Sequence, residues 1–384
     1  MGALMKSYRF DRSLLLLAVY SLFSATALFA ASAAVGHIEY MEGETSITRA
    51  GSILDNVDLG SVVENYDLLK TGSSGLIIIA LDKSTGMGGT LTIKPKSVFA
   101  VKTELVNGVP STEGDMIGGA VAVKVKKIAG TPDLRIKTSN SVMGVRGTEF
   151  DVTISVNDAI LVTCTDGRVV CASGSGEELE ALPGQLVQGK AGEKLRMVPV
   201  AVSSIETFRN DWISEEVSAF KASPLRALDQ YAKSYKRLRD DFRKAYTPLA
   251  SDPGLTGWIA NEKKPGFVYR PNDVTVMKQK SALAPKLMGL RGILFMFERV
   301  YYRLEEIRSL LSASDLRSRL DSGGTVADLY KILAQEKTEL EMKTAGYRNA
   351  LRLFAFYNEG REPIPGGSDS ADGDFFGDTS DFFD

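Results

Sequence analysis

The period of the hydrophobic pattern changes once along this chain, near residue 200. Over residues 35–200, apolar and polar residues alternate in short runs such as TLTIK and EFDVTISV, with frequent glycines between them. A period of two is typical of β-strands, and no helix-length periodic run interrupts these segments. We therefore predict an all-β domain over residues 34–200, folded as a compact roll or solenoid or as a sandwich.

Beyond residue 203, apolar residues recur every three or four positions, as one face of an amphipathic helix requires. Pro224 is expected to open a new helix, and Thr325 to cap a last helix that runs to about Tyr357. Residues 247–272 contain four prolines and are expected to form a long connection. The pattern predicts an antiparallel helical bundle over residues 203–360, as a domain separate from the β domain.

The first 33 residues have the features of a targeting segment. Three basic residues precede a long uncharged run, which ends in the small-residue step Ala31-Ser32-Ala33. This order is typical of a cleaved secretory signal peptide and predicts a periplasmic or extracellular protein. The alternative is a retained N-terminal anchor in the inner membrane, because the uncharged run is long enough to span a bilayer. Contact with the membrane is expected only in that second case.

Composition excludes several classes of function. The chain holds one histidine, His37, and two cysteines, too few for a multi-histidine metal site or a four-thiolate zinc site. The formal net charge of −2 argues against a nucleic-acid binder. We therefore expect no enzymatic activity, no cofactor and no metal ion. The enzymatic alternative is a glycan hydrolase with a carboxylate pair such as Glu149 and Asp151, but we interpret this pair as a solvated strand face.

The two cysteines lie close together in the sequence. Cys164 and Cys171 flank the segment TDGRVV, which predicts a β-hairpin that turns at Asp166-Gly167. Export permits disulfides, and such a hairpin would bring the two thiols onto one face. We expect a disulfide here; the alternative is two small buried residues in the reduced form.

The last part of the chain, residues 361–384, is acidic and bears two phenylalanine pairs. Residues 363–384 contain six aspartates and no lysine or arginine, whereas residues 203–362 contain 27 basic and 21 acidic residues. The composition predicts disorder. The pairs Phe375-Phe376 and Phe382-Phe383 predict a docking motif for the basic helical region of the same or a neighbouring chain, and hence self-association. The alternative is an inert solubilising tail.

The order of motifs in the β region resembles the FecR domain, a periplasmic module of bacterial envelope signalling proteins. The resemblance covers about residues 35–198. It includes LLKTGSSGLIIIAL, LTIKPKSVFAV, the closing turn ALPGQLVQ and the hallmark block SVMGVRGTEFDVTI. The hallmark residues are Val145, Arg146, Gly147, Thr148 and Phe150.

The hallmark block has a structural and a functional interpretation. The glycines permit unusual backbone angles, and Phe150 is expected to point inward. The Arg146 guanidinium can tie neighbouring carbonyl groups, which would make the motif structural. Alternatively, Arg146 contacts a partner or an anion.

The resemblance implies an envelope role but departs from the family at one end. FecR-type sigma regulators carry a cytoplasmic anti-sigma region before their membrane helix, whereas about a dozen residues precede the apolar run here. We therefore expect an exported, non-enzymatic scaffold or binding module for protein or cell-wall partners that lacks the anti-sigma region. The alternative is a transmembrane or periplasmic signalling regulator resembling FecR.

Overall fold

The structure is a computed structural model that describes residues 34–363, except residues 107, 127–132, 140, 146, 175, 191–192, 265–266 and 268–272. The predicted signal peptide, Arg146 and the acidic tail with Phe375, Phe376, Phe382 and Phe383 therefore lie outside the described residues.

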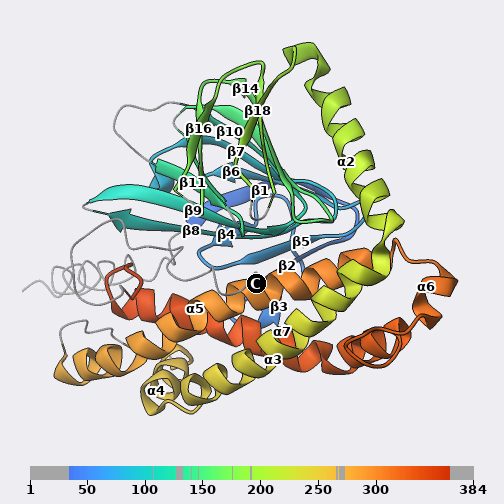
Figure 1. Cartoon of the computed structure of the whole chain (residues 1–384). Helices are drawn as coiled ribbons and strands as arrows, with labels where there is room; N and C mark the ends of the chain where they lie inside the picture. The colour runs from blue at the N-terminus through green and yellow to red at the C-terminus, as the bar shows by residue number, and fades with distance from the viewer. Residues whose placement is uncertain are drawn as a thin grey trace, which may run out of the picture. The chain divides into compact units, whose positions relative to one another are not determined.

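The β region consists of two nine-stranded sheets (Figure 1). The first sheet, sheet A, has the spatial order β18 (Arg196–Pro199), β17 (Gln185–Gly189), β14 (Ile160–Asp166), β13 (Glu149–Ile154), β10 (Ala120–Lys126), β7 (Gly88–Ile93), β6 (Leu76–Leu81), β1 (Ala34–Glu42) and β4 (Val62–Glu64). Sheet B has the order β16 (Glu178–Ala181), β15 (Val169–Ser173), β12 (Ser141–Val145), β11 (Asp133–Lys137), β9 (Val109–Gly118), β8 (Val98–Val106), β5 (Leu68–Thr71), β2 (Thr45–Arg49) and β3 (Ser52–Ile53).

The chain crosses repeatedly between the two sheets, and both sheets grow in the same direction along the sequence. Neighbouring strands pair antiparallel except β9 and β11, which are parallel. An apolar core that includes Ile77, Phe99 and Phe150 fills the space between the sheets. The predicted all-β region is confirmed, and it is a sandwich whose strands follow one another as in a solenoid.

The C-terminal region is helical, as predicted. Its elements are η2 (Val202–Ser204), α2 (Ile205–Ala222), α3 (Pro224–Ala250), α4 (Pro253–Glu262), α5 (Val274–Arg308), α6 (Ala313–Arg317) and α7 (Val326–Tyr357); the short helix η1 (Lys83–Thr85) lies in the β region. Helix α3 begins at Pro224, and Thr325 and Asp328 form a capping box at the start of α7. The connection predicted over residues 247–272 is wrong, because α3 continues through Pro248 and α4 follows directly.

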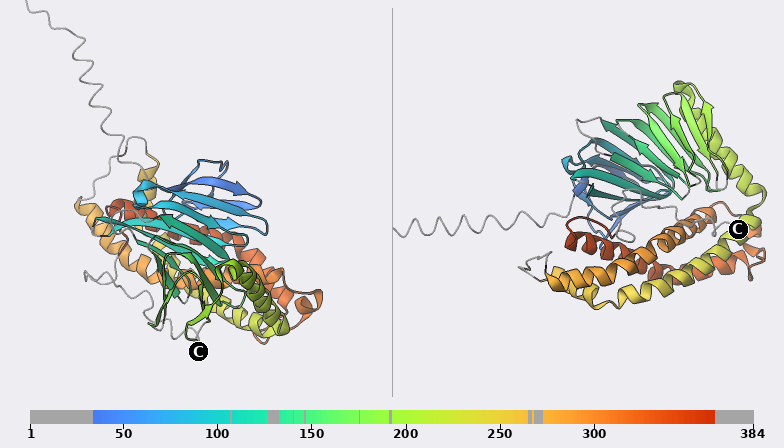
Figure 2. Two further views of the ribbon diagram at one scale, coloured as in Figure 1. Left: turned by 90° about the horizontal axis from the view of Figure 1, so that it is seen from above. Right: turned by 60° about the vertical axis from the view of Figure 1, so that its left-hand side comes forward.

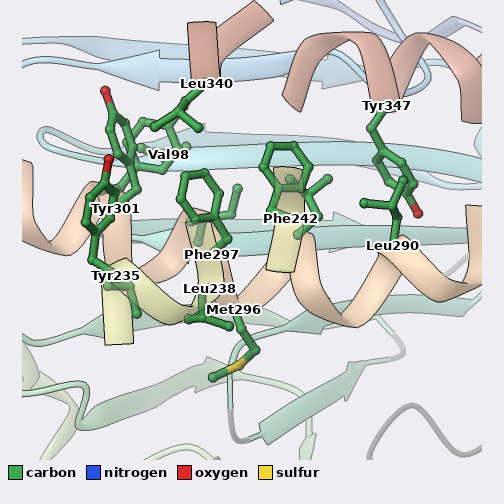
Figure 3. Packing of buried hydrophobic residues seen from close by; sticks show 14 of the residues in the cluster. Val98, Tyr235, Leu238, Phe242, Leu290, Met296, Phe297, Tyr301, Leu340 and Tyr347 are labelled. Atoms are coloured by element: carbon green, nitrogen blue, oxygen red, sulfur yellow. The ribbon is translucent and has the colours of Figure 1, made fainter. Parts of the chain in front are cut away.

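Three long helices, α3, α5 and α7, pack together, and their apolar core extends onto sheet B (Figures 1 and 2). The rings of Phe242 on α3 and Phe297 on α5 stack with centroids 5.1 Å apart. Val98 on β8 belongs to the same buried cluster, and Figure 3 shows it among the helical side chains. Leu68, Ala100 and Ile117 extend this contact along sheet B. The outer face of sheet B therefore forms part of the helical core, separate from the core between the two sheets.

Candidate binding site at the sheet–helix interface

A cavity of about 70 Å³ lies where β8 and β9 meet α5 and α7. Its walls include charged groups from both regions, among them Lys102 and Asp115 of sheet B and Arg291 and Arg348 of the helices. A cavity of this size with charged groups in a mainly apolar wall has room for ordered water or a small polar group. Burying charges costs free energy unless they are paired, so the pairing at this interface decides what the site can do.

Six charged side chains form a connected group beside this cavity. The Glu362 Oε2 atom lies 2.7 Å from the Lys102 Nζ atom and 3.2 Å from the Arg291 Nη2 atom. The Glu113 carboxylate lies 3.5 Å from the Lys102 Nζ atom and 2.5 Å from the Lys137 Nζ atom. We call this group the interface cluster; its members are Lys102, Glu113, Asp115, Lys137, Arg291 and Glu362.

Strand register explains why these side chains meet. Lys102 on β8 pairs directly with Glu113 on β9, and Lys137 on β11 pairs with Asp115. Side chains two residues apart on a strand share a face, so Glu113 and Asp115 both belong to the outer face of sheet B. Opposite charges at paired positions stabilise adjoining strands, and here the helices cover them.

The charges of the cluster shift one another's pKa values. Burial alone would lower the pKa of the Lys102 ammonium, but the carboxylates of Glu362 and Glu113 outweigh burial and raise it. Burial would raise the pKa of the Glu113 carboxyl, but Lys102 and Lys137 lower it to about 2. Burial would also raise the pKa of the Glu362 carboxyl, but the charges of Lys102 and Arg291 outweigh burial and lower it. These groups are therefore charged at neutral pH.

Glu362 reaches the cluster from a short segment after α7. The backbone turns at Glu359 and Gly360, whose φ angles are 57° and 82°. The Gly360 amide donates to the Ala355 carbonyl oxygen at 2.8 Å, which closes the end of the helix. The turn directs the chain back toward sheet B, where Glu362 is only 8% exposed.

A larger groove of about 420 Å³ adjoins the cavity. Tyr66 and Arg348 line both spaces, and the walls of the groove come from β2 and its neighbours and from α7. The Glu305 carboxylate lies 3.0 Å from the Lys70 Nζ atom and 3.2 Å from the Lys337 Nζ atom, so the two lysines share one acid. A groove of this volume with apolar and charged walls is typical of a binding site.

A second group of buried ion pairs joins the β13–β14 turn to the helices. Asp158, with a φ angle of 60°, lies 3.1 Å from the Arg299 Nη2 atom and 3.0 Å from the Arg303 Nη2 atom. The Tyr231 hydroxyl donates to Asp158 Oδ2 at 2.6 Å. Burial opposes ionisation of Asp158, but the two guanidinium groups lower its pKa. This turn therefore holds the sandwich against α3 and α5.

The described hallmark residues lie at the junction between the two sheets. Val145 ends β12 in sheet B, and Phe150 is buried in the core from β13 in sheet A. Gly147 has a φ angle of 64°, and the Thr148 hydroxyl donates to the Arg168 carbonyl oxygen at 3.0 Å. These contacts stabilise the crossing between the sheets, and the motif lies apart from the cavity described above.

The predicted hairpin between the two cysteines is wrong. Cys164 belongs to β14 in sheet A and Cys171 to β15 in sheet B, because the turn at Gly167 carries the chain from one sheet to the other. The thiols are buried and free, so the expected disulfide is not formed in the structure. Burial raises the pKa of the Cys164 thiol to about 11 and that of the Cys171 thiol to about 12.

The interface cluster was not predicted from the sequence, although one signal was present. Lys102 follows Val98 and Ala100 at two-residue spacing, so it occupies the apolar face that the helices cover. Glu149 forms an exposed ion pair with Lys124, whereas the partly buried Asp151 pairs with Lys94 and with Arg209 of α2. Within the described residues, no cluster of histidine, cysteine and acidic residues could hold a metal ion, and no helix there is long and apolar enough to cross a membrane.

Comparison with known proteins gives a family and a partial structural likeness. The model of the FecR protein family matches residues 70–170, and no curated protein matches the chain. Two crystal structures of a candidate anti-sigma factor from Parabacteroides distasonis ATCC 8503 are similar in part, with 13% and 11% sequence identity and a TM-score of 0.31 each. They cover 37% and 36% of this chain, which spans 63% and 62% of their length, less than two thirds.

The matched residues run from β5 to β15 and include strands of both sheets, the hallmark motif and three members of sheet B that carry the interface cluster. The order of these strands and the position of the hallmark motif agree with the resemblance seen in the sequence. Residues 70–170 of the β-sandwich therefore match the FecR protein family.

Proposed function

We propose that this protein is an exported, non-enzymatic envelope protein that binds protein or cell-wall partners through its FecR domain and helical region together. The interface between sheet B and the helices carries this proposal. The two regions share an apolar core and two groups of buried ion pairs, and a groove is lined by both. A ligand in this groove would contact the FecR domain and α7 at once.

The exposed apolar residues of the groove support a binding role. Ile53 on β3 is 65% exposed and Met342 on α7 is 60% exposed, and both line the groove. Exposed apolar side chains beside charged ones are common where a protein partner docks.

Site-specific photo-crosslinking in intact cells tests this proposal. A photoreactive amino acid at Met342 or Ile53 should capture the same partner. The matched control is Met197, which is 40% exposed and lies on β18 outside the groove. Mass spectrometry then identifies the adducts. If no reproducible adduct forms at either groove position, or if position 197 gives the same adducts, the proposal is wrong.

The proposed compartment needs its own experiment. Cell fractionation combined with N-terminal sequencing should find a soluble envelope protein that starts near Ala34. A chain that is found in the membrane fraction with an intact N-terminus would show that the segment is a retained anchor and not a cleaved signal peptide.

The second candidate function is a signalling regulator resembling FecR, and the FecR domain itself favours it. In this case the rigid contact between sandwich and helices would transmit the binding of an envelope ligand. Transcript profiling of a strain that lacks the gene distinguishes the two functions. A small, reproducible set of altered genes that returns to normal with the wild-type chain would favour the regulator.

A further inference from the structure

Glu362 is a buried acid that enters the interface cluster from outside any helix or strand. Its carboxylate contacts two cations from different regions, Lys102 on β8 and Arg291 on α5, at 2.7 and 3.2 Å. A carboxylate held by an ammonium and a guanidinium makes strong, charge-assisted contacts. The two cations are therefore placed to bind a carboxylate, and in the structure they bind that of Glu362.

Glu362 is the nearest acid to both of these cations. The Lys102 Nζ atom also has Glu113 at 3.5 Å and Glu104 at 4.0 Å, and the Arg291 Nη2 atom has Glu113 at 3.8 Å. The neighbouring Arg348 is already paired, because its guanidinium contacts both carboxylate oxygens of Glu298 at 2.6 Å. Loss of Glu362 would leave both cations with only these more distant acids, which costs free energy at a largely buried site, so an incoming carboxylate is favoured there.

The segment that carries Glu362 is short, and it buries Glu362 and Pro363. Its backbone hydrogen bonds are local: the amides of Gly360 and Arg361 donate to Ala355 and Asn358. The preceding residues, Glu359 and Gly360, both have positive φ angles, which places a tight turn between α7 and the segment. The ionic contacts of Glu362 with β8 and α5 therefore fasten a short arm whose backbone hydrogen bonds at Gly360 and Arg361 stay within the turn.

We propose that Lys102 and Arg291 form a carboxylate-binding site that Glu362 occupies in cis, and that an aspartate or glutamate side chain of a partner's extended segment displaces it. The adjoining cavity of about 70 Å³ gives the incoming group room beside Glu362. Displacement releases the arm. The proposal rests on the proposed binding function for its partner, whereas the site itself is a property of the purified chain.

Acetate tests the carboxylate-binding site directly. The full chain with Glu362→Ala vacates the site, and the matched control is Glu359→Ala, at an exposed glutamate on the same turn. Acetate, compared with chloride at equal ionic strength, should raise the Tm of the Glu362→Ala chain by about 2 °C or more. The wild type and Glu359→Ala should not respond, and adding Lys102→Met should abolish the effect. Equal effects of acetate and chloride on the Glu362→Ala chain would overturn the site.

The conservative variant Glu362→Gln keeps the shape of the side chain and tests whether its charge fastens the arm. Trypsin should cleave after the exposed Arg361 about fivefold faster in this variant than in the wild type, because the loss of a charge-assisted contact frees the arm. An unchanged cleavage rate would show that the carboxylate does not hold the arm and would overturn the proposal.

A peptide identifies the chemistry of the incoming group. A fluorescent peptide of residues 358–367 should bind the Glu362→Ala chain at least about tenfold more tightly than the same peptide with glutamine at position 362. Equal binding of the two peptides, or no binding of either, would overturn displacement by an acidic segment. These measurements use purified chain, so their failure is distinct from a failure to find a partner in cells.

Discussion

Glu113 and Asp115 lie two residues apart on one face of β9, and their carboxyl pKa values are displaced in opposite directions. Both groups are buried, which raises a carboxyl pKa. Lys102 and Lys137 overcome this effect at Glu113 and lower its pKa to about 2. At Asp115, burial and the nearby charge of Glu113 raise the pKa, and Lys137 compensates only in part. One strand therefore presents a stabilised and a destabilised carboxylate to the same interface.

Removing these two charges should have opposite consequences. Glu113→Gln leaves Lys102 and Lys137 with one acid fewer, so the free energy of unfolding at pH 7 should fall by about 3 kcal/mol. Asp115→Asn removes a carboxylate that burial disfavours, so stability should stay the same or rise. Urea unfolding monitored by circular dichroism measures both. Similar losses in the two variants would contradict the electrostatic interpretation.

Stability should also fall in acid over a defined range. The pKa of Glu113 is lowered from 4.5 to about 2, so the folded state binds fewer protons than the unfolded chain between these values. Its contribution is present above about pH 4.5 and is lost as the pH falls toward 2. Glu362 and Asp158, whose pKa values are also lowered, act in the same direction. In the Glu113→Gln variant, the fall in unfolding free energy between pH 5 and pH 2 should be less steep.

The β13–β14 turn should be a main support of the contact between sandwich and helices. Asp158→Ala leaves the buried guanidinium groups of Arg299 and Arg303 with one carboxylate fewer and should cost about 3–5 kcal/mol. Hydrogen exchange should accelerate in this turn and in the parts of α3 and α5 that contact it. Asp211→Ala, at an exposed position of α2, is the matched control and should change neither quantity. Unchanged exchange in Asp158→Ala would show that other contacts hold the interface.

Local signals predicted much of the fold. The alternation of apolar and polar residues predicted the β region, Pro224 predicted the start of α3, and Thr325 predicted the cap of α7. These features depend on neighbours within a few residues. Pro248 was misread as part of a connection, because a proline near a helix end can be tolerated when the surrounding packing supports the helix.

Contacts between distant residues were not visible in the sequence. Asp158 and Arg303 are 145 positions apart, and each alone is a charged residue that a solvated surface would explain. They meet because the sandwich packs against α5, and a single sequence does not show which surfaces pack against each other. The hairpin predicted at TDGRVV was wrong for a related reason. The residues of the turn suit a hairpin, but the strands on either side pair with strands of different sheets.

The two thiols give a last prediction, because their burial on different sheets determines their reactivity. The thiolate is the reactive form, and burial raises the pKa of Cys164 to about 11 and of Cys171 to about 12. The native chain at pH 8 should therefore resist alkylation by iodoacetamide, whereas both thiols should react once guanidinium unfolds it. Mass spectrometry counts the adducts under each condition. Rapid labelling of the native chain would contradict their burial, and a purified chain that gains no adduct when unfolded without reductant would instead contain the disulfide.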